Sequence, residues 1–166
     1  MKKLLLLPIL LFSLAAFSQT GRKSPHDTVS SKDNNITVTY GRPYKKGRVV
    51  FGTLEKYGQV WRLGADEATT ITFKKDTKFG DTPIPAGTYT MFAIPEEKTW
   101  TMILNSELGQ WGAFGYEKIK DKNVARFTVP THYLDSPIEQ LSIHFEEDDQ
   151  MVIEWDVVRV FIPISY

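Results

Sequence analysis

The chain has 166 residues, enough for one domain, of which 42% are hydrophobic and 13% aromatic, and its 20 basic side chains balance 20 acidic ones. It has no cysteine, which excludes a thiol nucleophile, a disulfide framework, a cysteine-ligated metal and the anchor of a lipoprotein. The balanced charge provides no long-range attraction to nucleic acid or to an anionic membrane, so neither is expected as a partner.

Residues 1–18 are typical of a secretory signal peptide. A basic pair near the start is followed by an apolar run over residues 4–16, and Ala16 and Ser18 place small residues at the −3 and −1 cleavage positions. The apolar run is shorter than the roughly 20 residues that a membrane-spanning helix needs. We therefore expect cleavage after Ser18, no membrane span afterwards, and export to the periplasm or the medium. An uncleaved anchor is the competing interpretation.

The remainder divides into a polar segment and one domain. Residues 19–34 are polar and contain turn-forming residues, which predicts a flexible N-terminal arm. Residues 35–166 then form the domain. Within it, apolar side chains recur with the period of two that is typical of half-buried strands. This pattern predicts strands at residues 36–40, 69–73, 88–94, 99–105, 124–129, 138–145, 151–155 and 158–162.

Short strands separated by turn signals about every ten residues indicate an all-β fold. We predict an antiparallel β-sandwich, jelly-roll-like, or a partly open barrel, with about eight to ten strands and little helix. One stretch departs from this pattern. In residues 108–116, glycines separate Trp111, Phe114 and Tyr116 without any period of 2 or 3.6, which predicts a loop that carries aromatic side chains.

Charged residues interrupt a core-forming run at residues 60–73. Arg62, Asp66 and Glu67 lie between apolar residues, and an unpaired charge held near a core costs several kcal/mol or more. One interpretation is an internal ion pair between the guanidinium and a carboxylate. The other is a site in which Asp66 or Glu67 meets a ligand hydroxyl or amine. Ion-pair networks commonly look like sites, so both interpretations stay open.

A hydrolase is the enzymatic alternative, with Glu67 as its acid or base. Glycoside hydrolysis needs two carboxyl groups about 5 to 9 Å apart. Neighbouring side chains on a strand point to opposite faces, so Asp66 and Glu67 could form such a pair only on a loop. The spacing of the sequence identifies no other second acid.

No metal or cofactor is expected. His26, His132 and His144 lack the short spacing of a metal site and are predicted to lie at the surface. No phosphate-binding or dinucleotide-binding motif is present. Trp111, with Tyr116 nearby, could stack on a sugar ring or plug one end of the fold, and the sequence leaves both possibilities open.

Short motifs are spread over the chain: Ser24-Pro25, Arg42-Pro43, Lys46-Gly47-Arg48, Phe51-Gly52, Val60-Trp61-Arg62, Gly64-Ala65, Glu67-Ala68-Thr69-Thr70, Pro85-Ala86-Gly87-Thr88-Tyr89 and Trp111-Gly112-Ala113-Phe114. Together they resemble a bacterial family catalogued as "domain of unknown function 2911", over nearly the whole mature chain. The family pattern has Asn where this chain has Asp66. The resemblance implies an all-β exported domain and supplies no activity or catalytic residue.

The leading hypothesis is an exported β domain that binds a carbohydrate or another cell-envelope component. Its site would consist of Arg62, Asp66, Glu67, Trp111 and Tyr116. The alternatives are the hydrolase that uses Glu67 and a structural or assembly protein that has no ligand site.

Overall fold

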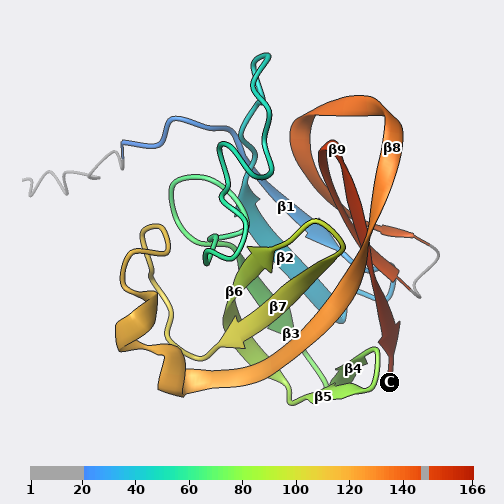
Figure 1. The fold of residues 1–166 in the computed structure, drawn as a ribbon. Coiled ribbons are helices and arrows are strands. Elements are labelled where there is room, and N and C mark those ends of the chain that lie inside the picture. Colours follow the sequence, from blue (N-terminus) through green and yellow to red (C-terminus); the bar gives the residue numbers. More distant parts are fainter. Residues whose placement is uncertain (1–20, 147–149) are drawn as a thin grey trace, which may run out of the picture.

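The protein is described by a computed structural model that covers residues 21–146 and 150–166. Nine strands form one antiparallel sheet that is not closed, in the order β1-β2-β3-β6-β7-β8-β9-β4-β5 (Figure 1). The prediction of an all-β fold with eight to ten strands is confirmed. The strands are β1 (His26–Ser30), β2 (Ile36–Gly41), β3 (Thr70–Phe73), β4 (Thr77–Phe79), β5 (Thr82–Ile84), β6 (Gly87–Pro95), β7 (Thr99–Asn105), β8 (Asn123–Glu146) and β9 (Gln150–Ser165).

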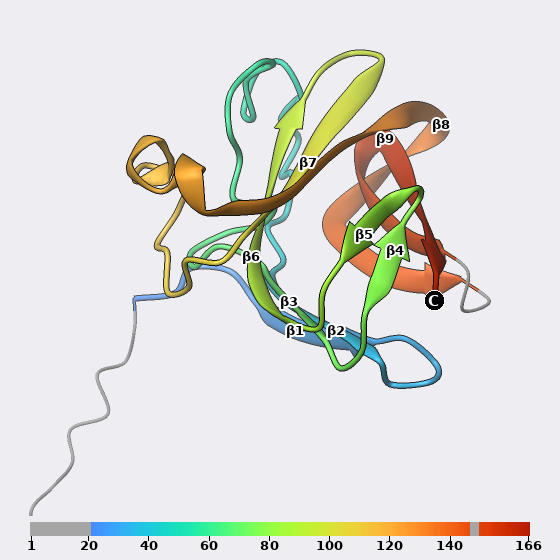
Figure 2. The same ribbon diagram turned by 90° about the horizontal axis from the view of Figure 1, so that it is seen from below.

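The long strand β8 makes the sheet curl around a core. Its first part pairs with β7 as far as Pro130, and from Thr131 onward it pairs with β9. β8 therefore crosses from one half of the sheet to the other (Figures 1 and 2). Both halves bury apolar side chains in one cluster, which includes Trp100 from β7 and Trp155 from β9. The result is a sandwich-like arrangement made by a single open sheet.

Strand alternation determines which side chains reach this core. Ile36, Val38 and Tyr40 of β2 are buried, while the threonines between them face outward. The Tyr40 hydroxyl accepts a hydrogen bond from the backbone N–H of Ile143 at 2.8 Å and lies 3.3 Å from the carbonyl oxygen of Ile143, to which it donates. Because Ile143 lies on β8, this tyrosine links the two halves of the sheet through the core.

Several strand boundaries differ from the predictions. β1 lies inside the segment predicted as an N-terminal arm, and it was hidden because its only apolar residue, Val29, is half-buried at the sheet edge. The short strands β4 and β5 lie in a stretch for which no strand was predicted. β8 and β9 each join two predicted strands, and they continue through Pro130 and Pro163. The predicted signal peptide, residues 1–18, lies outside the described residues.

The long connection between β2 and β3 fills one end of the curled sheet. It contributes Val50, Phe51, Trp61 and Leu63 to the core, and the ring of Trp61 stacks on that of Trp155 with 6.0 Å between centroids. This packing brings the polar run that follows Trp61 to the rim of the fold.

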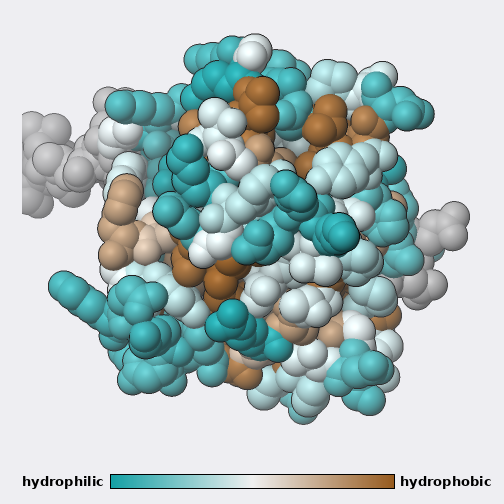
Figure 3. All heavy atoms as spheres, viewed as in Figure 1, coloured by the Kyte–Doolittle hydropathy of each residue, from teal (hydrophilic) through white to brown (hydrophobic). Residues whose placement is uncertain are grey.

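A second, smaller apolar cluster lies apart from this core, against residues of β6 and β7. Phe92, Ile103 and Tyr116 belong to it, and Tyr116 comes from the connection between β7 and β8. That connection contains two 3-10 turns, η1 (Tyr116–Lys118) and η2 (Lys120–Lys122). The face seen in Figure 3 is mostly hydrophilic, with hydrophobic residues in small separate areas. Among the described residues, no helix has the length and apolar character required to cross a membrane.

Candidate functional site

The polar run predicted from the sequence leaves the sheet as a loop. Trp61 pairs with Ala93 of β6 through two backbone hydrogen bonds of 2.7 and 2.9 Å, and the carbonyl of Thr69 accepts the N–H of Met91 at 2.7 Å. The chain between Trp61 and Thr69 therefore starts and ends on the same strand. The N–H of Thr69 donates to the carbonyl of Arg62 at 3.1 Å and closes the loop. We call residues 62–69 the excursion loop.

The excursion loop is held in a constrained conformation against the end of β2. A Cβ atom added to Gly41 would lie 2.2 Å from the carbonyl oxygen of Ala65, so only glycine permits this close approach. Leu63 and Asp66 have φ angles of 55° and 64°, in the left-handed region that non-glycine residues seldom adopt. Strained residues of this kind gather at functional sites, where the surrounding structure holds them in place.

The two adjacent acids hold the segment that precedes β1. One carboxylate oxygen of Asp66 accepts the backbone N–H groups of Lys23 and Ser24, both at 3.1 Å. The Glu67 carboxylate binds the Arg22 guanidinium, whose Nε and terminal nitrogen lie 2.9 and 2.8 Å from Oε1. The hydrogen bond from Arg22 is the main reason that the pKa of Glu67 is lowered. Both acids thus find partners inside the chain.

His26 lies beside the acid pair, which sequence reasoning did not foresee. Its Nε2 is 3.4 Å from a Glu67 oxygen and 3.8 Å from an Asp66 oxygen, and its side chain is only 18% exposed. His26 and Glu67 border a cavity of about 230 Å³ together with Arg22 and Tyr40. No pattern in the sequence marks His26, because the two acids beside it lie some 40 residues further along the chain.

Arg62 does not join the acid pair. Trp61 points into the core, so alternation turns the next side chain to the opposite face. Within residues 21–146 and 150–166 the Arg62 guanidinium makes neither a hydrogen bond nor an ion pair, and its buried Nε has no acceptor. The internal ion pair between Arg62 and a carboxylate, one of the two interpretations left open by the sequence, is therefore not formed, and Arg22 pairs with Glu67 instead.

Arg62 instead borders an open pocket of its own, with a volume of about 230 Å³. We call it the Arg62 pocket, and its lining consists of Glu55, Gln59, Val60, Trp61, Arg62, Ala113 and Phe114. Phe114 is 91% exposed, an unusual position for a phenylalanine. Burial raises the pKa of Glu55 to about 7, although the positive charges of Arg62 and Arg48 act in the opposite direction.

The glycine-rich loop brings its aromatic side chains to three different environments. The backbone of Trp111 bridges that of Glu67, but its indole is 51% exposed and borders neither the His26 cavity nor the Arg62 pocket. Tyr116 is buried, packs edge-on against Phe92 at 5.3 Å and accepts a hydrogen bond from the Asn123 amide at 2.7 Å. Only Phe114, exposed and next to Arg62, contributes to an open pocket.

Comparison with known proteins shows to which family the chain belongs. The model of a family described as "Protein of unknown function (DUF2911)" matches residues 24–164. The chain belongs to this family. No curated protein and no solved structure matches it. The family description names no activity, and the match includes both sides of the excursion loop as well as the pocket-lining residues Glu55 and Phe114.

The geometry around Glu67 does not suit acid–base hydrolysis. A general acid that works near neutral pH needs a raised pKa, whereas Arg22 lowers that of Glu67. The neighbouring Asp66 carboxylate already accepts two backbone N–H groups. Among the residues that the structure describes, no three His, Asp or Glu side chains are grouped so as to hold a metal ion.

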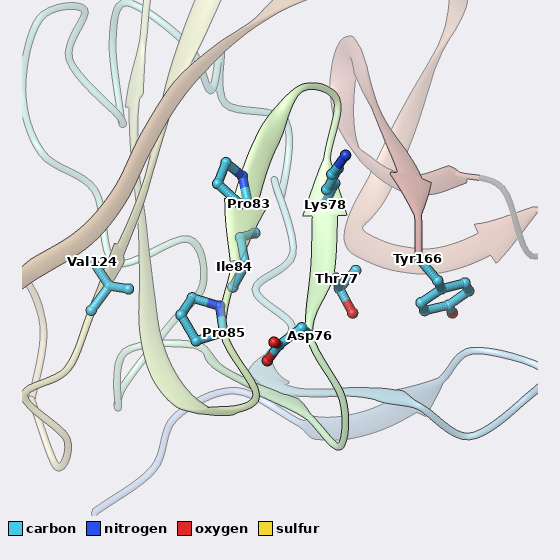
Figure 4. Close-up of a pocket in the computed structure, with 8 residues that line it drawn as sticks. All are labelled: Asp76, Thr77, Lys78, Pro83, Ile84, Pro85, Val124 and Tyr166. Carbon is cyan, nitrogen blue, oxygen red and sulfur yellow. The ribbon is translucent and has the colours of Figure 1, made fainter.

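A larger cavity of about 370 Å³ lies along the β4–β5 hairpin (Figure 4). Pro83, Ile84 and Pro85 line it on the side facing Val124. Its one carboxylate, Asp76, already accepts the N–H of Ala86 at 2.8 Å. Among the described residues, the lining of this cavity holds no buried polar atom that lacks a hydrogen-bond partner.

The Arg62 pocket holds the Arg62 Nε and the His26 cavity holds the His26 Nε2, both buried and without such a partner. His26 lies 3.4 Å from a Glu67 oxygen, whereas Arg62 has no ion-pair partner among the described residues, so the Arg62 pocket is the better candidate site.

Proposed function

We propose that this chain is an exported binding protein whose ligand, a carbohydrate or another cell-envelope component, occupies the Arg62 pocket. The observation that carries the proposal is the buried Arg62 Nε, which has no acceptor among the described residues. A buried donor without a partner costs about 1–3 kcal/mol, and more when it belongs to a charged group. A ligand oxygen that accepts this N–H would recover that cost.

The rest of the pocket supports a saccharide. Phe114 offers an exposed aromatic ring, against which the apolar face of a sugar can pack. Gln59 and Glu55 provide an amide and a carboxyl group for the hydroxyls of that sugar. Most of the exposed lining of this pocket is polar, which suits the hydroxyl groups of a sugar better than an apolar ligand.

The proposal reassigns the residues singled out from the sequence. Arg62 keeps a ligand role, whereas Asp66 and Glu67 secure the chain before β1. Tyr116 is buried under the glycine-rich loop, and Trp111 lies outside the Arg62 pocket. Export is supported by the signal-like pattern of residues 1–18 and by a cysteine-free composition that needs no disulfides.

A glycan array tests the proposal. Arg62→Met and Phe114→Ala should each weaken retention by about tenfold or more, equivalent to about 1.4 kcal/mol of binding free energy. Two matched controls should bind like the unmodified chain. Arg126→Met removes an exposed arginine on β8, and Trp111→Ala removes an exposed aromatic ring of the same loop outside the pocket.

The readout separates binding from folding. Circular dichroism and urea unfolding should show that Arg62→Met retains its fold. An array that retains no glycan, or a folded Arg62→Met variant with unchanged retention, would contradict the proposal.

A further inference from the structure

We propose that the ligand of the Arg62 pocket is an acidic saccharide, recognised through its carboxylate by the Arg62 guanidinium. This inference rests on the binding function proposed above and names its substrate class. A planar guanidinium pairs with a carboxylate through two parallel hydrogen bonds, a geometry that a single sugar hydroxyl cannot match. A neutral sugar would leave the positive charge of a half-buried arginine uncompensated.

Other half-buried cations show what the Arg62 pocket lacks. Arg42 is paired with Asp27 at 3.1 Å, and Lys45 and Arg159 form ion pairs with Asp156 and Glu154. In each of these pairs the chain supplies the carboxylate. Arg62 has no such partner among the described residues, so the complementary carboxylate has to come from outside.

The nearest acid does not neutralise Arg62. Glu55 lines the same pocket but forms no ion pair with Arg62 within the described chain. It is fixed by a tight turn in which its N–H donates to the carbonyl of Val50 at 2.9 Å and its carbonyl accepts the N–H of Gly52 at 2.8 Å. Since burial raises its pKa to about 7, Glu55 is only partly ionised at neutral pH.

The charges that act on Glu55 are those of Arg62 and Arg48. The other wall of the pocket, Ala113 and Phe114, brings no titratable group. Arg62 is the one cation among the described residues that line the pocket, the positive charge of Arg48 also acts on Glu55, and the pKa of Glu55 is raised, so the pocket favours an anion at neutral pH. Protonated Glu55 can also donate its O–H to a ligand carboxylate.

The affinity for an acidic sugar should therefore depend on pH in a stated direction. The ligand carboxylate stays ionised above about pH 4. As the pH rises through the pKa of Glu55, a second negative charge appears beside the ligand and weakens binding. Affinity should increase about threefold to tenfold from pH 8 to pH 6. Glu55→Gln should remove this dependence, because the amide carries no charge at either pH.

Calorimetry on the full chain with two matched pairs of sugars tests the inference. The pairs are methyl β-glucuronide with methyl β-glucoside, and N-acetylmuramic acid with N-acetylglucosamine. Within each pair, only one member carries a carboxylate. At least one acidic member should bind about tenfold more tightly than its neutral counterpart. Arg62→Met should abolish this difference, and Arg126→Met should preserve it.

The outcomes separate this inference from the binding function. Equal affinity for the acidic and neutral members would overturn the inference and leave the binding function standing. A preference for the acidic member that persists in the Arg62→Met variant would also overturn the inference and leave the binding function standing. If neither pair binds, the glycans retained on the array decide: a retained set that is only neutral overturns the inference. An array that retains nothing overturns both proposals.

Discussion

The charged side chains at the two ends of the excursion loop differ in whether they have partners within the chain. Asp66 and Glu67 find every partner within the chain, from two backbone N–H groups and from Arg22. Arg62, only four residues before Asp66, has no partner among the described residues. The acid pair therefore holds the segment before β1 in place, and Arg62 is the group for which the ligand role is proposed. Proximity in the sequence says little about which charges share a partner.

The course of the chain explains this difference. The excursion loop turns back on itself, so its acidic end faces the segment before β1 and its basic end faces Glu55 and Phe114. At the acidic end, two backbone N–H groups and the Arg22 guanidinium provide the partners of the two carboxylates. The other end is bordered by an exposed aromatic ring and a carboxyl group of raised pKa, and remains open.

The largest expected effect comes from displacing the whole excursion loop. Gly41→Ala would place a Cβ atom 2.2 Å from the Ala65 carbonyl oxygen. Because backbone has to move on one side or the other, we expect the free energy of unfolding to fall by about 3–4 kcal/mol. Urea denaturation measures this. Gly115→Ala is the control, since its added Cβ would meet only a side-chain oxygen at 3.4 Å. Equal losses in both variants would show that the close approach does not hold the loop.

A smaller effect tests the acidic end alone. Asp66→Ala removes the acceptor of two backbone N–H groups and leaves a non-glycine residue at positive φ, which should cost about 2–3 kcal/mol. Asp66→Asn keeps an acceptor oxygen and tolerates this φ, so its cost should stay below about 1 kcal/mol. Urea unfolding measures both losses.

Limited trypsin digestion adds a local readout for the same pair of variants. Cleavage after Arg22 and Lys23 should be faster in Asp66→Ala, since two of the hydrogen bonds that hold this segment are lost. Matching stabilities and digestion rates for the two variants would mean that Asp66 does not secure the segment.

The smallest expected effect on stability lies at the basic end. Arg62→Met should leave the free energy of unfolding unchanged or raise it by up to about 1 kcal/mol, because it removes a buried donor that has no acceptor. The same variant should lose the acidic sugar. Urea unfolding and calorimetry on one preparation compare the two effects. A stability loss above about 2 kcal/mol would make Arg62 a structural residue and remove the contrast with the acid pair.

Local sequence patterns were enough to predict the all-β class and much of the core. Ile36, Val38 and Trp100 are buried where the period of two predicts them, because alternation is a local property of the extended backbone. The charged run at residues 62–67 lies in the excursion loop, and Arg62 from this run borders an open pocket. Composition alone excluded cysteine chemistry.

Which charges pair with one another depends on the folded arrangement of the chain. Arg22 and Glu67 are separated by 45 positions, and they meet because β1 pairs with β2 and brings the preceding segment across the excursion loop. Likewise, Glu55 and Phe114 meet Arg62 through the packing of two long connections. The energy of such contacts depends on where the curled sheet brings distant segments together, which no local period encodes. For that reason the acid pair holds the segment before β1, while Arg62 borders an open pocket.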